Sequence, residues 1–206
     1  MERLIAMGAE AKVYESEFLG IPAIRKVRIP KPYRVKELDE ELRRRRTAAE
    51  ARAYMRAKEF GVPCPAVLDI HGAELILEKI EGEVLRDILG SLNDEEVSRV
   101  AEQVGRIVAR LHKAGIVHND LTGVNIIVSP GLRVSLIDLG LSSFSVSTED
   151  RAVDLHVLKQ SLKAVEPKRA EAFFSAFCSA YSDELGEEAR EVLSRLRKVE
   201  ERGRYK

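Results

Sequence analysis

The chain has 206 residues, of which 45% are hydrophobic and 33% charged, and its 34 basic and 34 acidic side chains give a net charge of zero. This balance excludes a disordered chain and a protein that binds polyanions over its whole surface. Cys64 and Cys178 are too few and too far apart for a disulfide scaffold or a zinc site, so we expect two ordinary thiols. No apolar run approaches the roughly 20 residues of a bilayer crossing, and the N-terminus is too mixed for a signal peptide. We therefore expect a soluble, cytoplasmic protein with no membrane contact.

The first part of the chain is predicted to be rich in strands. Residues 3–7, 11–19 and 22–29 are short segments of branched and aromatic residues separated by glycine-containing turns. Residues 36–60 contain no Gly or Pro and repeat apolar residues at helical spacing, which predicts one long helix. Two further strands, at 65–70 and 73–80, are then expected.

The second part is predicted to be mostly helical, with one hairpin whose strands run over 125–128 and 133–138. Helices are expected near 83–89, 94–114, 149–164, 167–181 and 185–200. The fold class is therefore α+β, as one domain over 1–206. It consists of a small β-rich N-lobe (1–80), a reduced helical C-lobe (81–194) and a basic tail (195–206).

The residues with the clearest chemistry lie on either side of the hairpin. Asp120 follows His118-Asn119 in a loop, Asn125 comes five residues later, and Asp138 opens the sequence Asp-Leu-Gly where the hairpin ends. Alone, the loop tetrapeptide is also compatible with an ordinary turn or cap. The full set favours phosphoryl transfer, which needs a carboxylate near the incoming hydroxyl and oxygen ligands for magnesium.

These motifs resemble those of the protein-kinase-like superfamily, with Asn119 where ordinary kinases carry Arg. The resemblance implies a bilobal kinase-like fold that binds ATP and Mg²⁺. Asp120 would be the catalytic base, and Asn125 and Asp138 would be the metal ligands.

Such a fold also needs a strand lysine for the nucleotide phosphates and a helix glutamate to hold that lysine. Strand alternation puts Arg25 on the face opposite Lys26, and the register A-I-R-K resembles V-A-I-K, which favours Lys26. Glu50 is a lone carboxylate on an alanine-rich stretch of the long helix, which suits close approach to another element. The alternatives are a solvated strand lysine and one of several exposed helix glutamates.

The nucleotide-binding loop and the connection after residue 77 are assigned by resemblance alone. The loop reads Ala-x-Gly-x-x-Ala-x-Val and retains only the central Gly8 of the kinase glycine loop, so Gly8 and Ala9 would approach the phosphates. The backbone C=O of Glu78 and N–H of Ile80 would pair with the adenine. The alternative is an ordinary strand end without ligand contacts.

Motifs along nearly the whole chain resemble a narrower family, the small atypical kinase subunits of the KEOPS complex. They are G-A-E-A, K-x-R-x-x-K-x-Y-R, R-R-T-x-x-E-A-R, H-x-D-L-T-x-x-N, I-D-x-G-L-S, E-D-R-A-V-D-L and the terminal R-G-R. No A-P-E motif or long activation segment follows Asp138. The resemblance implies an ATP- and Mg²⁺-dependent serine/threonine kinase and ATPase whose chief partner is the threonylcarbamoyl-transferase subunit. The complex forms threonylcarbamoyladenosine in tRNA beside the anticodon.

Two surfaces and two rival functions stay open at this point. Residues 25–46 carry ten basic and four acidic side chains, and the tail at 195–206 is also basic. Both are compatible with RNA or an acidic partner and with solubilising charge. The rival functions are a small-molecule phosphotransferase of the aminoglycoside type and a non-catalytic nucleotide-binding scaffold.

Overall fold

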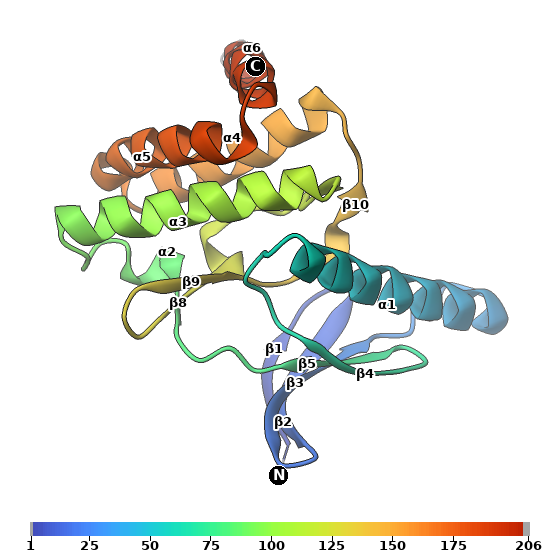
Figure 1. Ribbon diagram of the computed structural model, residues 1–206. Coiled ribbons are helices and arrows are strands. Elements are labelled where there is room, and N and C mark those ends of the chain that lie inside the picture. Colours follow the sequence, from blue (N-terminus) through green and yellow to red (C-terminus); the bar gives the residue numbers. More distant parts are fainter. Residues whose placement is uncertain (1, 204–206) are drawn as a thin grey trace. The chain divides into compact units, whose positions relative to one another are not determined.

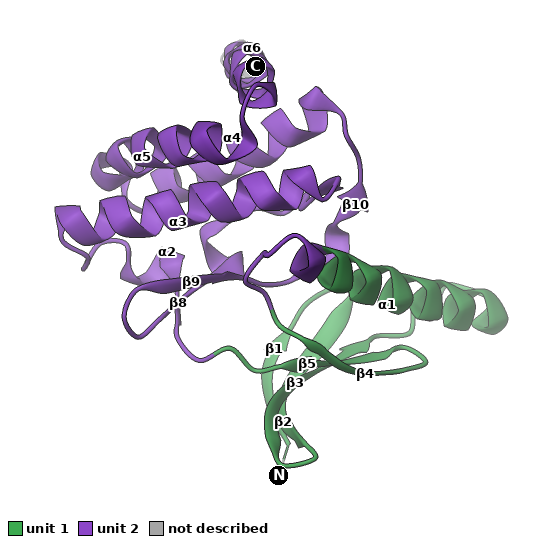
Figure 2. Ribbon diagram, viewed as in Figure 1, with its two compact units in different colours: residues 1–56, 65–80 green, residues 57–64, 81–206 purple. Residues whose placement is uncertain are grey.

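Residues 2–203 are described by the computed structural model, and they fall into two units that share one chain (Figures 1 and 2). Unit 1 runs up to residue 56 and resumes at 65–80. Unit 2 contains 57–64 and the described chain from residue 81 onward. None of the helices within residues 2–203 combines the length and the hydropathy that a membrane-spanning segment needs.

Unit 1 is built on an antiparallel sheet with the strand order β1-β2-β3-β5-β4. Its strands are β1 (Arg3–Met7), β2 (Ala11–Phe18), β3 (Ile21–Arg28), β4 (Val67–His71) and β5 (Glu74–Glu78). Helix α1 (Lys36–Glu59) connects β3 to the chain that leads into β4 (Figure 1). Small and aromatic side chains of α1, among them Ala53 and Tyr54, are buried, as are Ala23, Leu75 and Leu77 of the sheet.

Helix α1 forms because its sequence contains strong helix formers without interruption and has an acidic first turn. It ends where Gly61 adopts a left-handed conformation with φ of +70°. There the N–H of Gly61 donates to the Lys58 carbonyl, and the N–H of Val62 donates to the Ala57 carbonyl. Such a glycine satisfies the last carbonyls of a helix, which explains why Gly-Val-Pro terminates it.

Unit 2 contains a helical core and two small antiparallel sheets. The core helices are α2 (Leu85–Ile88), α3 (Asp94–Lys113), α4 (Thr148–Val165), α5 (Pro167–Leu185) and α6 (Glu188–Gly203). The strands and 3₁₀ turns are β6 (Glu83–Val84), β7 (Ile116–Val117), η1 (Gly123–Asn125), β8 (Ile126–Ser129), β9 (Arg133–Leu136), η2 (Leu139–Leu141) and β10 (Ser143–Phe144). Strand β8 pairs with β6 and β9, and β7 pairs with β10.

Helices α3 and α5 form the centre of the core (Figure 1). A Cβ atom at Gly105 would lie only 2.5 Å from the Phe177 carbonyl oxygen, so the absence of a side chain there permits the close approach. The rings of Phe177 and Tyr181 stack with centroids 5.8 Å apart. Asn93 begins α3 with a capping box, in which its side chain accepts from the Glu96 N–H while Glu96 accepts from the Asn93 N–H.

The predicted α+β class, with a β-rich first part and a helical second part, is confirmed, while several element boundaries differ from the prediction. The segment expected as a helix over 83–89 begins as strand β6 and becomes helical only at Leu85. Helix α5 extends to Leu185, because Gly186, with φ of +79°, is the first residue that breaks it. Residues 195–203 of the expected tail belong to α6, and 204–206 lie outside the described residues.

Candidate functional site

In unit 1, the structure brings Lys26 and Glu50 together. Nζ of Lys26 on β3 lies 2.8 Å from Oε1 of Glu50 on α1. The other carboxylate oxygen of Glu50 accepts from Nη2 of Arg28 at 2.6 Å. All three side chains are largely withdrawn from solvent, with exposed fractions of 11%, 1% and 5% for Lys26, Glu50 and Arg28. Sequence reasoning missed Arg28, although alternation already places it on the same strand face as Lys26.

Arg25 lies on the opposite face of β3, as the alternation predicts. It pairs with Glu74, whose Oε2 is 2.8 Å from Nη1, and with Glu2. Its guanidinium also lies over the Tyr14 ring, 4.9 Å from the centroid. Arg25 therefore contacts Glu2, Glu74 and Tyr14 and does not hold Glu50.

The loop that contains Gly8 and Ala9 is a turn between β1 and β2. The Gly8 N–H donates to the Ala11 carbonyl at 2.9 Å, and the Ala9 carbonyl accepts from Lys31 Nζ. A Cβ atom at Gly8 would meet nothing closer than 3.8 Å, so the turn itself does not require glycine. The backbone N–H of Gly8 is thus already used within the turn.

The segment with Glu78 and Ile80 follows the end of β5 and is the last part of unit 1. The Glu78 N–H donates to the Ala66 carbonyl at 2.9 Å, and its side chain accepts from the Ala66 N–H at 3.0 Å. The next N–H, that of Lys79, donates to the Pro22 carbonyl. These bonds fix the backbone just before Ile80, which is half-buried.

In unit 2, Asp120 and Asn125 are hydrogen-bonded to each other. Nδ2 of Asn125 donates to the Asp120 carbonyl at 2.8 Å and to Asp120 Oδ2 at 3.0 Å. Because both bonds use the amide nitrogen, Oδ1 of Asn125 is the atom that suits a metal ion. Asn125, which is 6% exposed, is the last residue of the 3₁₀ turn η1 and lies directly before β8.

Asp138 is connected to the same loop through its neighbour Ile137. The Ile137 N–H donates to the Asn125 carbonyl at 2.9 Å, and Nε2 of His118 donates to the Ile137 carbonyl at 3.1 Å. Asp138 itself adopts a left-handed conformation with φ of +56°, and its Oδ1 accepts from the Gly140 N–H at 3.1 Å. Asp is among the few non-glycine residues that tolerate this conformation. The hairpin therefore brings the segments of Asp120, Asn125 and Asp138 together.

Asn119, the departure from the usual kinase motif, has a structural role. Its backbone is also left-handed, with φ of +63°, which Asn accepts more readily than most residues. Its Nδ2 donates to the Leu141 carbonyl at 3.0 Å and to the Ser143 Oγ at 2.9 Å. Asn119 thus joins the loop before Asp120 to the segment after Asp138.

Asp154 on α4 anchors this loop by hydrogen bonds and was not among the predicted site residues. Its carboxylate accepts from the backbone N–H of His118 at 2.5 Å and of Asn119 at 2.8 Å. The side chain is 1% exposed. Only the tertiary structure reveals this contact. The sequence shows Asp154 as one aspartate of the motif E-D-R-A-V-D-L, and it does not indicate which groups the carboxylate binds.

A buried network extends from Asp154 into the helical core. Nε2 of His112 lies 3.3 Å from Oδ2 of Asp154, and Nδ1 of His112 lies 2.8 Å from the Tyr181 hydroxyl. Burial lowers the pKa of His112, against the opposing effect of the Asp154 carboxylate. A neutral ring then donates from Nε2 to Asp154 and accepts from Tyr181, whose own pKa is raised by burial.

Replacing Asp154 by asparagine should lower the free energy of unfolding by about 1–3 kcal/mol, because two buried N–H donors would compete for one carbonyl oxygen. Chemical denaturation monitored by circular dichroism measures the change. The control is Glu149→Gln on the same helix, since Glu149 pairs with Arg195 and Arg202 near the surface. That change should cost at most about 1 kcal/mol. Equal stability of the Asp154 variant and the unmodified protein would contradict the anchoring role.

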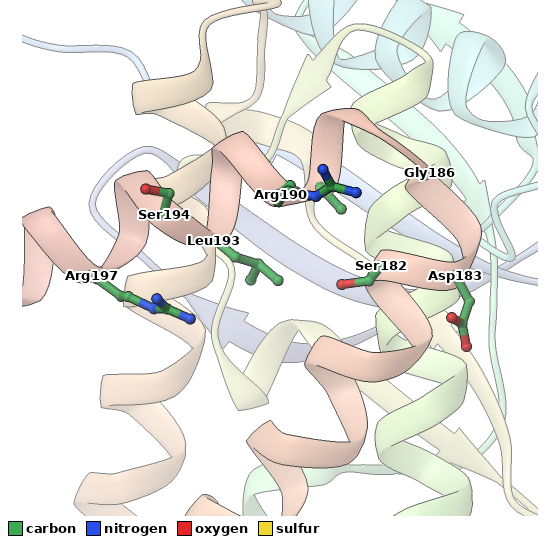
Figure 3. Close-up of a pocket in the computed structure, with 8 residues that line it drawn as sticks. Ser182, Asp183, Gly186, Arg190, Leu193, Ser194 and Arg197 are labelled. Atoms are coloured by element: carbon green, nitrogen blue, oxygen red, sulfur yellow. The ribbon is translucent and has the colours of Figure 1, made fainter.

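Unit 2 also has a hollow of about 540 Å³ between the end of α5 and α6 (Figure 3). Its lining combines Asp183 with Arg190 and Arg197, and it includes none of the predicted site residues.

Among the described residues, no group of three or more His, Cys, Asp and Glu side chains is arranged to hold a metal.

Comparison with known proteins identifies the family. The RIO domain model matches residues 11–165. The KEOPS complex subunit Bud32 of Pyrococcus abyssi is 43% identical in an alignment 213 positions long, which covers 99% of this chain and 96% of that protein. The chain belongs to the Bud32 family. The resemblance to the small KEOPS kinase subunits is thereby confirmed, and the matched RIO domain contains Lys26, Glu50, Asp120, Asn125 and Asp138.

Other Bud32-like proteins give a consistent picture. A probable serine/threonine-protein kinase BUD32 homolog of Archaeoglobus fulgidus is 43% identical and matches 98% of this chain and 95% of its own length. A probable bifunctional tRNA threonylcarbamoyladenosine biosynthesis protein of Methanothermobacter thermautotrophicus is 39% identical, and the match spans 36% of that longer chain. The assignment to a family of serine/threonine kinases is therefore confirmed.

A solved structure confirms the fold at lower sequence identity. The Rio2 kinase of Chaetomium thermophilum, crystallised as an ADP/Mg²⁺-phosphoaspartate complex, superposes with a TM-score of 0.66 at 15% identity. The match covers 97% of this chain and 70% of the Rio2 chain.

Proposed function

We propose that this Bud32-family chain is an ATP- and Mg²⁺-dependent serine/threonine kinase and ATPase. Its work would be in a KEOPS complex that forms threonylcarbamoyladenosine in tRNA beside the anticodon. The observation that carries the proposal is the hydrogen-bonded pair Asp120 and Asn125, with the segment of Asp138 bonded to the Asn125 backbone. The names of the relatives support the choice of complex and of tRNA modification.

Each predicted residue has one role in this proposal. The Asp120 carboxylate orients the attacking hydroxyl or water and accepts its proton. Asn125 Oδ1 and the Asp138 carboxylate are the hard oxygen ligands that suit Mg²⁺, which when bound offsets the charge of the nucleotide phosphates. The Rio2 kinase, which has a similar fold, was crystallised with ADP and Mg²⁺, and this supports a nucleotide and Mg²⁺ as the proposed ligands.

In unit 1, Lys26 holds the α- and β-phosphates and Glu50 orients it, while Gly8 and Ala9 lie beside the phosphates. The adenine pairs with the Glu78 carbonyl and the Ile80 N–H. The threonylcarbamoyl-transferase subunit is the proposed partner, and tRNA is the proposed target of the assembled complex. A direct contact with RNA through the basic residues 195–206 remains part of the proposal, although only 195–203 lie within the described helix α6.

The basic run of α1 is less suited to RNA than its composition indicates. Arg44 and Arg45 both pair with Glu41, and Arg46 pairs with Glu10. Arg43 pairs with the buried Asp39, whose pKa it lowers. Because each of the four arginines is already paired with a carboxylate, we do not propose this run as an RNA site.

A non-catalytic scaffold is the second candidate, and one observation favours it. The Gly8 N–H is already bonded to the Ala11 carbonyl, so it is not offered to a phosphate. A scaffold would bind nucleotide without transferring phosphate. The deciding experiment therefore has to separate nucleotide binding from chemistry.

The test incubates the full chain with γ-labelled ATP, alone and with the threonylcarbamoyl-transferase subunit. Mg²⁺ is present in one series and EDTA in the other. We expect Mg²⁺-dependent label on the protein that survives acid and hydroxylamine, as a serine or threonine phosphate does, and phosphate release when the partner is present. Hydroxylamine-labile label would instead indicate an acyl phosphate on an aspartate. Nucleotide binding without label or phosphate release would favour the scaffold.

A further inference from the structure

A single buried carboxylate in unit 1 serves two cations of the same strand face. Oε1 of Glu50 accepts from Lys26, and Oε2 accepts from Arg28. Nη2 of Arg28 also lies 3.5 Å from the carbonyl oxygen of Arg46, one helical turn before Glu50 on α1. Arg28 therefore contacts the helix at two points, its backbone and its carboxylate.

Burial makes the Arg28 contact hard to break. A guanidinium does not lose its proton in a protein, so it cannot adapt to a buried place by becoming neutral. Removing one partner of a buried ion pair leaves an uncompensated charge, and this is strongly unfavourable. With Arg28 5% exposed, any movement of Glu50 away from β3 would leave such a charge.

From these contacts we infer that Arg28 is a positioning residue for the Lys26–Glu50 pair. It holds Glu50 and the adjoining turn of α1 against β3, so that the Lys26–Glu50 pair stays assembled. The inference rests on the proposed function, because it concerns how Lys26 meets the nucleotide. Arg28 acts through Glu50 and does not itself contact ATP.

The test compares KM for ATP with kcat in Arg28→Met, measured on the full chain with its partner subunit. We expect KM to rise about 10-fold, the size expected for a lost charge-assisted hydrogen bond, with a smaller change in kcat. Arg28→Lys, which keeps the charge, should restore most of the ATP affinity. The matched control is Arg25→Met, which removes two ion pairs on the opposite face of the same strand. This substitution should leave both KM and kcat unchanged.

A double-mutant cycle with Glu50→Gln shows whether Arg28 acts through Glu50. We expect Arg28→Met to raise KM much less in the Glu50→Gln background than alone. Additive effects, or a KM in Arg28→Met equal to that of the control, would overturn the inference. If Arg28→Met lacks a cooperative melting transition, Arg28→Gln decides, and an unchanged KM in that folded variant would likewise overturn it.

Failure of this inference and failure of the proposed function give different results. An unmodified chain that binds ATP but never turns it over contradicts the proposed kinase and ATPase activity. An active unmodified chain whose Arg28 variants keep normal ATP affinity contradicts only the positioning role.

Discussion

Asp138→Asn should lower ATP turnover by about 1,000-fold, because loss of the carboxylate charge weakens metal binding and removes several kcal/mol of stabilisation from the transferring phosphate. Asparagine is the sharper substitution at this position. It tolerates the left-handed backbone of Asp138, and its amide oxygen can still accept from the Gly140 N–H. The variant therefore removes a charge while it preserves the local backbone, and a large effect can be assigned to the metal ion.

Two measurements check this prediction. Steady-state phosphate release gives the loss of turnover, and titration with a nucleotide analogue at low and high Mg²⁺ gives the metal dependence of binding. We expect the Mg²⁺-dependent part of the affinity to fall. The control is Asp87→Asn, an exposed carboxylate of the same unit that pairs with its neighbour Arg86. Normal turnover in the Asp138 variant would refute the assignment of the metal ligands.

Asp120→Asn should lower the rate of phosphate transfer by about 10²- to 10⁴-fold while nucleotide binding is retained, which is the expected result of losing a general base. An asparagine at this position can still accept the hydrogen bond from Asn125 Nδ2. The loop should therefore keep its shape, and only the proton acceptor is lost. This separates Asp120 from Asp138, whose substitution should also weaken Mg²⁺-dependent binding.

The measurement is single-turnover transfer from γ-labelled ATP together with the dissociation constant of the nucleotide analogue. The Asp87→Asn variant again serves as the control, and a melting curve for each variant confirms that the fold is intact. If the Asp120 variant lost nucleotide binding to the same extent as transfer, Asp120 would be a binding residue and not the base.

Local sequence patterns were sufficient for most of the secondary structure. The long uninterrupted α1, the helix α3 and the hairpin turn between β8 and β9 depend on neighbours within a few residues, and the structure contains all three. Two-residue strands such as β7 and β10 show no alternation that could be recognised.

Some of the side chains that meet across long sequence distances could be predicted from the sequence, and others could not. The motif residues Asp120, Asn125 and Asp138 are predictable because one hairpin connects them, so their spacing already fixes their approximate positions. Asp154 and Arg28 were not predicted as site residues. Their roles depend on which buried donors and carboxylates face them once α4 and α1 are packed.

The amino-acid sequence by itself determined the class of fold, the phosphoryl-transfer motifs and the kinase-like family, since these reside in short-range periodicity and in characteristic residue order. Only the tertiary structure decided that Glu50 is shared between Lys26 and Arg28 and that Asp154 anchors the loop before Asp120. The physical reason is burial, because a buried charge needs a partner of opposite sign or a hydrogen-bond donor. The partners of these carboxylates lie 22 to 36 positions away in the sequence, so only the packing of the folded chain selects them.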